Sequence, residues 1–393
     1  MLKSFIDRIK PDFEPNGKFS FLHSTFEAFE SFLYVPDKVT TRGTHIRDPF
    51  DMKRAMIMVV IALVPCALFG MYNVGYQHYL ATGTIVEQGF WNIFAYGLWK
   101  IAPLFIISYV VGLGIEFAFA EFRKHEVNEG FLVSGFLIPL ISPPDIPLWI
   151  LALSTAFAVI IGKEIFGGTG MNIWNPALLA RAFMFFAYPS QISGDSVWVV
   201  DAVSAATPLS NVAQGAIDML PSTDELFWGL IPGSVGETSK FCILLGAIIL
   251  LWTRIASART MFAVIAGGGL LAFILNVSGV TEVTALQQLL MGGFLFGAVF
   301  MATDPVTSAN TNRGKWIYGL LIGMIAVVIR VFNPAYPEGM MLAILLMNTF
   351  APLIDYLVVD GNIRKRKKRV KVVVSGSGAA DTKPARMVQI DEI

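Results

Sequence analysis

The sequence predicts an all-α polytopic membrane protein, and three observations lead to that prediction. Hydrophobic residues make up 55% of the 393 residues and charged residues only 15%, whereas a soluble domain carries about 25% charge. Several apolar runs, counted with their flanks, are close in length to the roughly 20 residues that span a bilayer. Examples are MIMVVIALVPCALFGMY (56–72) and FCILLGAIILLW (241–252). Gly and Pro interrupt other runs, including GKEIFGGTGMNIWNP (162–176), which predicts broken half-helices.

We expect about ten transmembrane helices in two halves, residues 55–188 and 240–357, joined by the connection 189–239. A polar lead-in (1–54) precedes them, and a basic tail (358–393), which we expect to be flexible, follows. Asn-Pro-Ala stands at the start of the last span of each half, at Asn175 and Asn333. Because five spans is an odd number, the halves would insert with opposite topology, as inverted repeats do. The spans are expected near 55–75, 93–121, 129–142, 147–163, 173–188, 240–257, 260–278, 285–302, 315–332 and 339–357.

The distribution of Lys and Arg predicts the orientation, because cytoplasmic connections are enriched in both. The connection 189–239 has neither, and it carries several acidic residues. The lead-in, the tail and the alternate connections are basic, with Lys100, Arg181 and Arg330 as exceptions. Both termini are therefore expected in the cytoplasm of a bacterium, with 189–239 on the periplasmic side of its inner membrane. The net charge of zero argues against nucleic acid as a partner.

The break at 162–176 is the clearest candidate for a polar site within the membrane, where free backbone must face protein or a cavity. Gly167, Gly168 and Gly170 permit positive φ and close backbone approach. Asn172 and Asn175 would lie on one face of a helix and offer amide donors and acceptors. Such a set suits the edge of a planar heteroaromatic ring. A purely structural helix break is the alternative.

Acidic residues in or beside membrane spans are costly unless they pair or function. Four are present, Glu116, Glu164, Asp304 and Asp355, and their oxygen ligands suit Na⁺ or protons rather than soft metals. Asp304 could instead cap a turn, and Glu116 and Asp355 could be exposed near span ends. The sequence contains two cysteines, in separate apolar segments, which exclude a CxxC pair or a four-cysteine iron–sulfur cluster.

Several stretches closely resemble one family, the B subunits of the Na⁺-translocating NADH:quinone reductase. They are RKHEVNEGF (123–131), GKEIFGGTGMNIWNPALLARAFMFFAYPSQISGD (162–195), MATDP (301–305) and NPAYPEGMMLAILLMN (333–348). The resemblance extends over essentially the whole chain. The D subunit of the Rnf complex is a paralogue, and the long polar lead-in favours the quinone reductase. The alternative from another functional class is a urea-type permease without a redox cofactor. The inverted repeats of such permeases resemble the pattern in this chain.

The resemblance implies FMN joined through its phosphate to a threonine in the motif Asp-x-x-Ser/Thr-Gly/Ala-Ala-Thr. This motif corresponds to residues 201–207, DAVSAAT, and makes Thr207 the attachment site. Ala205 stands where glycine is more usual. A flavin transferase must reach the hydroxyl, so an exposed segment with small side chains on the outer face is expected.

The resemblance further implies a non-covalent riboflavin, a bound ubiquinone or menaquinone, and Na⁺. We assign riboflavin to Gly170, Asn172 and Asn175, and quinone to Gly112 and Glu116. Glu116 and Asp355 match the family's Na⁺-linked acids by local context. Electrons would arrive from the FMN-bearing C subunit of a six-subunit complex, pass through both flavins and reach quinone, coupled to Na⁺ movement. The flavins carry the redox chemistry, so no catalytic side chain is assigned.

Overall fold

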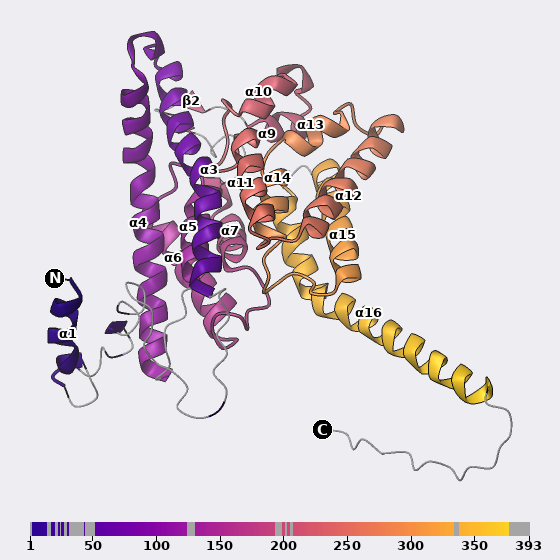
Figure 1. Cartoon of the computed structure of the whole chain (residues 1–393). Helices are drawn as coiled ribbons and strands as arrows, with labels where there is room; N and C mark the ends of the chain where they lie inside the picture. The colour runs from indigo at the N-terminus through magenta and orange to yellow at the C-terminus, as the bar shows by residue number, and fades with distance from the viewer. Residues whose placement is uncertain are drawn as a thin grey trace.

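Helices make up nearly all of the computed structural model (Figure 1). It describes residues 2–13, 52–123, 130–192, 199–200, 203–204, 207–333 and 338–376, with a few further positions between 17 and 43. Among these residues, five helices are long and apolar enough to cross a membrane. They are α3 (Met52–Ala81), α4 (Phe90–Arg123), α12 (Ala258–Val277), α15 (Asn312–Phe332) and α16 (Met340–Gly376).

The other expected spans are short or broken. Three are single apolar helices, α5 (Phe131–Ile141), α7 (Pro176–Ala187) and α11 (Lys240–Trp252). The fourth is α6 (Leu148–Val159), which continues into a π-helical turn, η3 (Ile160–Glu164). The eighth is divided into α13 (Ala285–Leu290), α14 (Phe294–Phe296) and a second π-helical turn, η6 (Gly297–Met301). Helices thus occupy all ten regions, and the prediction of an all-α polytopic membrane protein is confirmed.

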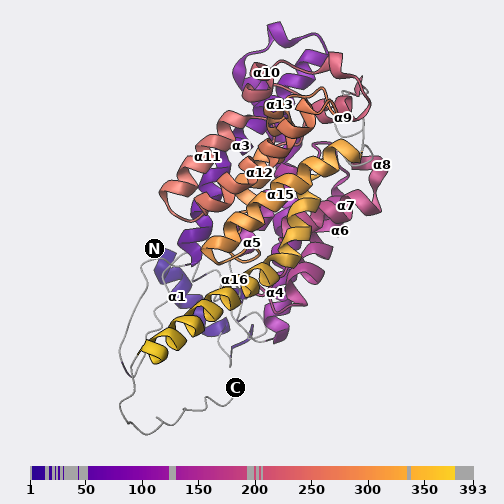
Figure 2. The same ribbon diagram turned by 90° about the vertical axis from the view of Figure 1, so that its right-hand side faces the viewer.

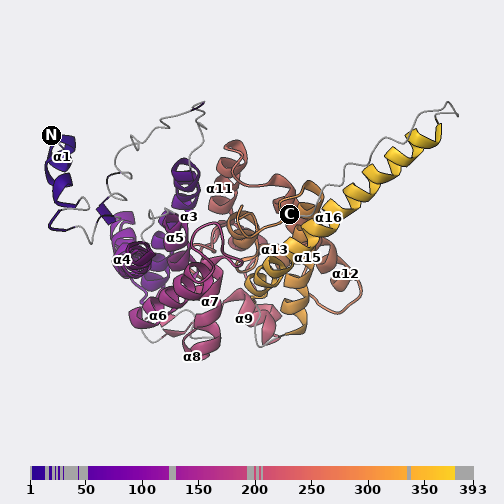
Figure 3. The same ribbon diagram turned by 90° about the horizontal axis from the view of Figure 1, so that it is seen from below.

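The two halves share a packing order. In the first half α4 packs against α5 and α6, and α6 packs against α7; in the second, α12 packs against α13 and α15, and α15 against α16. In Figure 1, α3 ascends while α11, which opens the second half, descends. The halves lie side by side when the molecule is seen along its length (Figure 3) and are joined by the packing of α3 on α11. This arrangement agrees with two repeats of opposite direction.

The connection between the halves gathers at one end of the bundle. It contains α8 (Pro189–Ile192), a short antiparallel hairpin of β1 (Val199–Val200) and β2 (Val203–Ser204), α9 (Pro208–Ala213), η5 (Ile217–Met219) and α10 (Thr223–Trp228). Helices α9 and α10 lie at the upper end in Figures 1 and 2, opposite the end of α4 and the basic part of α16. The charge pattern predicts this separation; which end faces the cytoplasm stays a prediction.

Two expectations about the ends of the spans are wrong. Residues 358–376 of the basic tail, expected to be flexible, are helical, because Lys and Arg are good helix formers and Asp360 pairs with Arg364 one turn later; residues 377–393 lie outside the described chain. Asn175 does cap α7, but Asn333 ends α15 and α16 begins only at Met340. The two Asn-Pro-Ala sequences are therefore not structurally equivalent at their Asn, and residues 334–337 lie outside the described chain.

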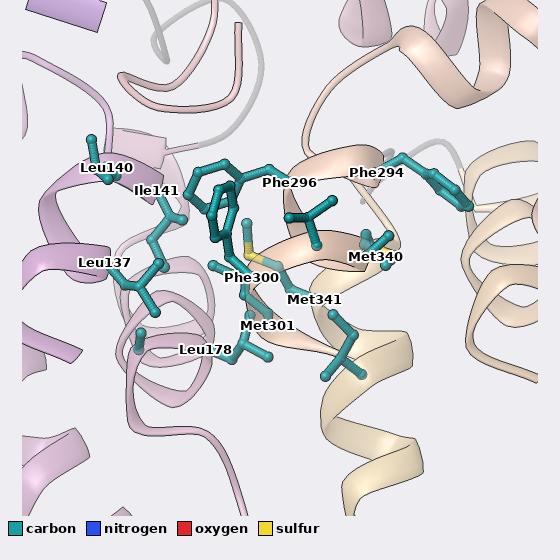
Figure 4. Close-up of a cluster of buried hydrophobic side chains, with 14 of the residues drawn as sticks. Leu137, Leu140, Ile141, Leu178, Phe294, Phe296, Phe300, Met301, Met340 and Met341 are labelled. Carbon is teal, nitrogen blue, oxygen red and sulfur yellow. The ribbon is translucent and has the colours of Figure 1, made fainter. Parts of the chain in front are cut away.

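An apolar layer separates the two ends of the interface between the halves (Figure 4). Leu137 and Ile141 of α5 face Phe296 and Phe300 of the broken eighth span, and Met301 completes the contact. All five side chains are buried. This apolar layer divides the polar side chains of the interface into two regions, an inner region near residue 304 and an outer region near residue 292.

Small residues let α12 and α15 approach closely. Gly268 of α12 lies beside Gly323 of α15, and Gly319 of α15 packs against Thr260 and Ala263 of α12. A Cβ at Gly323 would collide with the carbonyl oxygen of Val264. Close backbone approach at small residues is a main source of helix association in lipid.

We expect Gly323→Ala to lower the free energy of unfolding by about 1–3 kcal/mol, because the backbone it meets cannot give way. Gly114→Ala is the matched control, since Gly114 is an exposed helical glycine with open space around it; it should be neutral or stabilising. Denaturant unfolding of the purified protein in detergent measures both. Equal effects of the two variants would contradict the proposed helix contact.

Candidate functional site

A hollow opens between the two halves, and its empty space, including the part open to solvent, is about 800 Å³. Both halves contribute to its wall, as do the start of α3 and the break before α7. The lining residues are Ala55, Met56, Val59, Gly130, Val133, Ser134, Leu137, Lys163, Thr169, Asn172, Asn175, Pro176, Leu250, Ile255, Ala256, Phe300, Thr303, Asp304, Pro305 and Val306. We call this hollow the inner pocket.

The glycine-rich break forms one wall of the inner pocket. Gly167, Gly168 and Gly170 have φ values of 116°, 96° and 92°, so the expected positive φ is confirmed at all three. A Cβ at Gly170 would meet no atom within 4 Å. The segment is not helical before Pro176, so Asn172 and Asn175 do not share a helix face, but both line the pocket.

The amides of Asn172 and Asn175 hold this break in shape. Asn175 Oδ1 accepts from the backbone N–H groups of residues 177 and 178 at 3.0 and 3.4 Å, and its Nδ2 donates to Asp304 Oδ2 at 3.4 Å. Asn172 Oδ1 accepts from the N–H of Gly170 at 3.3 Å, and its Nδ2 donates to the Trp174 carbonyl at 3.0 Å. These bonds give both amides a structural role, and their contact with riboflavin stays a prediction.

Thr169 adds a polar group that the sequence pattern did not single out. Its hydroxyl is buried and makes no hydrogen bond, although the side chain lines the inner pocket. A buried polar atom without a partner is uncommon and suits a ligand with a hydrogen-bonding edge. The sequence feature that could have pointed to Thr169 is its position inside the Gly-Gly-Thr-Gly run.

Glu116 is buried in an ion pair. It contacts the ammonium of Lys163 on the π-helical turn η3, and both side chains are at most 5% exposed. Arg123 binds the neighbouring Glu164 through the carboxylate at 3.3 Å and the carbonyl oxygen at 2.7 Å. The alternative of an exposed Glu116 is therefore wrong. Because π-helical turns re-aim side chains, η3 presents Lys163 to both Glu116 and the inner pocket.

The remaining predicted residues lie in separate settings. Gly112 packs against the ring of Phe131, which fills the space a side chain would need. Asp355 accepts from the N–H of Asn310 at 2.6 Å and from the N–H and hydroxyl of Thr311 at 2.9 and 2.5 Å. Among the described residues no group of three His, Cys, Asp or Glu side chains could hold a metal ion. The quinone and Na⁺ assignments stay predictions.

Thr207 lies at the other end of the bundle, as the N-cap of α9. Its hydroxyl oxygen accepts from the N–H of Ser210 at 3.2 Å, and Pro208 occupies the first helical position. The residue is half-buried. Asp201, Ala202, Ala205 and Ala206 of the motif lie outside the described residues, so the expected exposure of the segment is not tested there.

Comparison with known proteins identifies the family. The model of the NQR2, RnfD, RnfE family matches residues 39–364. The chain belongs to this family. Relatives named as the B subunit of the Na(+)-translocating NADH-quinone reductase include that of Ectopseudomonas mendocina (strain ymp), 45% identical, that of Azotobacter vinelandii, 43% identical, and that of Yersinia pestis, 44% identical. Each alignment covers 94% of this chain and 99% of the relative.

For this member of the NQR2, RnfD, RnfE family we expect Glu116→Gln to lower the free energy of unfolding by about 3–5 kcal/mol, because it leaves a buried lysine without its carboxylate. Combining it with Lys163→Met is expected to restore most of the loss. Asp360→Asn is the control, since its partner Arg364 is 76% exposed and such pairs contribute about 0–1 kcal/mol. Similar losses from Glu116→Gln and Asp360→Asn in denaturant titrations would contradict the buried pair.

Proposed function

We propose that this chain is the membrane-embedded B subunit of a bacterial Na⁺-translocating NADH:quinone reductase. It would carry FMN on Thr207 and riboflavin in the inner pocket, and pass electrons to quinone with Na⁺ movement. The observation that supports this most is the identity of 43–45% over 94% of the chain to proteins of that name. The other subunits, including the FMN-bearing C subunit, and a flavin transferase would be its partners in the inner membrane.

The paralogous D subunit of Rnf belongs to the same family model, so the family alone does not separate the two. The names of the near-full-length relatives favour the quinone reductase, and family membership gives no support to a urea-type permease. Purifying the complex and testing quinone against ferredoxin as the electron partner distinguishes the paralogues.

Thr207 suits covalent attachment through its hydroxyl. It begins α9 at the end of the bundle formed by the Lys- and Arg-free connection, where a transferase would approach from outside. Pro208 fixes the backbone that follows, so the attachment point is held, and the two residues before Thr207 are alanines with small side chains. When bound, flavin supplies the redox chemistry; the chain supplies position and environment.

The chemistry of the inner pocket favours a flavin without phosphate. Its lining, within the described residues, includes one basic side chain, Lys163, and that charge is paired with Glu116. A phosphate would therefore meet Asp304 without a free cation. The hydroxyl of Thr169, which has no hydrogen-bond partner and lies in the pocket wall beside Gly170, suits the polar edge of a planar ring instead. These features support riboflavin there, with Asn172 holding the wall.

Quinone and Na⁺ are proposed along the buried face of α4 and its neighbours. A quinone beside Gly112 and Glu116 requires the Phe131 ring to turn away from Gly112. Na⁺ would pass near Glu116 and Asp355, whose carboxylates are held by Lys163 and by the loop before α15.

We expect Thr207→Ala to abolish covalent flavin, because no hydroxyl remains to form the phosphoester. Thr207→Ser keeps the hydroxyl and is expected to retain flavin. Ultraviolet fluorescence of the band in a denaturing gel and the intact mass of the protein measure both. A fluorescent Thr207→Ala band would overturn the assignment.

We expect Thr169→Val to lower riboflavin affinity by about 2–12-fold, the loss of one hydrogen bond, while covalent FMN stays. Thr260→Val is the matched control: its hydroxyl is also buried and without a partner, but it does not line the inner pocket. Flavin released from the purified complex and quantified by chromatography measures the content. The double variant Asn172→Ala, Asn175→Ala is expected to lower riboflavin content further. Unchanged content in both pocket variants would indicate that this break has only a structural role.

A further inference from the structure

The last long helix, α16, continues from its apolar part into a strongly basic stretch, residues 358–376. This stretch contains seven Lys and Arg residues and one acidic residue, Asp360. Asp360 pairs with Arg364 at 2.7 Å, so one carboxylate offsets one of the seven positive charges. Residues 362–368 are all exposed. The proposed flavin, quinone and Na⁺ sites make no use of this stretch.

Aromatic side chains indicate where the membrane ends along α16. Tyr356 is 67% exposed, and Trp252 at the end of α11 and Trp316 near the start of α15 are 85% and 48% exposed. Asp355 binds the N–H of Thr311 just before α15, so Tyr356 and Trp316 lie at the same end of the bundle. Exposed Trp and Tyr side chains concentrate at the headgroup level of membrane proteins. The basic stretch therefore begins next to the lipid headgroups at this end.

Helix α16 leans outward as it leaves the bundle. Figure 3 views the molecule from below, and α16 extends far to one side of the other helices. In Figure 1 the same part descends obliquely, whereas α4 runs along the bundle. A helix that leans outward stays close to the membrane surface, and it turns toward that surface the side that faces lipid inside the membrane. We call this the outward side of α16.

The outward side can be followed from the apolar part of α16 into the basic stretch. Four exposed apolar residues repeat along it at intervals of three or four: Leu346, Phe350, Leu353 and Leu357. Arg364 lies 18 residues, about five turns, after Leu346. Lys367 lies 11 residues, about three turns, after the exposed Tyr356. Both basic residues therefore continue the outward side.

The opposite side of α16 faces the bundle, where Met347, Ala351 and Ile354 are buried. By helical spacing, Lys365 lies about three turns after Ile354, and Arg369 about five turns after Ala351. One Lys and one Arg thus stand on each side of a helix about 10–12 Å across. Because the Debye length at physiological ionic strength is about 8 Å, charges on the far side interact more weakly with a membrane surface.

We propose that the outward side of the basic stretch docks, through Arg364 and Lys367, onto anionic phospholipids of the leaflet next to Tyr356. Clusters of about four to eight Lys and Arg that directly follow a transmembrane helix attract anionic lipid headgroups. Asp360 lies one turn before Arg364 and opposes this attraction. Docking would fix the end of α16 whose Asp355 holds the loop before α15. The inference goes beyond the proposed function and does not depend on the flavin assignments.

Hydrogen–deuterium exchange of residues 358–376 tests the docking, because the amides of a docked helix exchange only after it opens. The full chain is placed in nanodiscs of phosphatidylcholine alone, or of an equal mixture of phosphatidylcholine and phosphatidylglycerol. Exchange is expected to be slower in the anionic discs by at least about fivefold, the effect of one basic residue at an anionic surface. High salt is expected to remove this difference.

Matched pairs of substitutions separate the outward side from overall charge. Arg364→Gln combined with Lys367→Gln is expected to remove most of the lipid-dependent slowing. Lys365→Gln combined with Arg369→Gln removes the same charge from the other side and is expected to keep most of it. Asp360→Asn is expected to increase the slowing, because a negative charge leaves the region next to the membrane. Each variant is compared with itself in the two lipids, which cancels changes in intrinsic helix stability.

Lipid-dependent slowing in the chain alone that disappears with the Arg364 and Lys367 pair supports the proposal. Equal exchange of the unaltered chain in the two kinds of disc would overturn it, as would equal losses from the two double variants. Slowing that occurs only in a complex with other subunits, and equally in both lipids, would also overturn it, because a protein would then cover the basic stretch in place of lipid.

Discussion

Lipid offers no hydrogen bonds to free backbone, so every helix break at membrane depth must find its partners within the protein. In this chain charged side chains supply many of them. Arg330 binds three carbonyl groups around the broken eighth span, Asp355 binds two successive amides before α15, and Arg123 binds the carbonyl at the end of η3. Charges that look functional in the sequence are therefore also the groups that make irregular backbone possible here.

The broken eighth span connects the features that matter for function. Gly292 lies under Leu209 at the outer end, Phe296 and Phe300 form part of the apolar layer, and Asp304 lines the inner pocket. One short stretch of chain thus touches the helix bearing Thr207, the barrier between the halves and the inner pocket. Movement of this segment would reach all three at once, since its π-helical turn η6 lies between the two polar ends.

Hydropathy, with Gly and Pro as interruptions, was enough to predict the ten helical regions and the positive φ of the glycine-rich break. Contacts between distant residues were not predictable in this way. Lys163 lies 47 residues after Glu116, and only the π-helical turn aims its ammonium at that carboxylate. The cap formed by Asp355 depends on a loop 44 residues earlier. The burial of the Thr169 hydroxyl without a partner depends on the folded backbone and has no counterpart in a sequence pattern.

The three exceptions to the charge pattern do not conflict with the predicted orientation, because each of them has a partner within the protein. Positive residues bias insertion when they are free in short connections, and none of these three is free. Lys100 pairs with Asp145 at 2.9 Å, Arg181 pairs with Glu338, and Arg330 is enclosed by carbonyl groups. Each of these three charges is thus matched locally by carboxylate or backbone, whereas the basic residues from Arg364 to Lys368 are exposed. The prediction that α9 lies outside therefore depends on the exposed basic residues of α16 and not on these three.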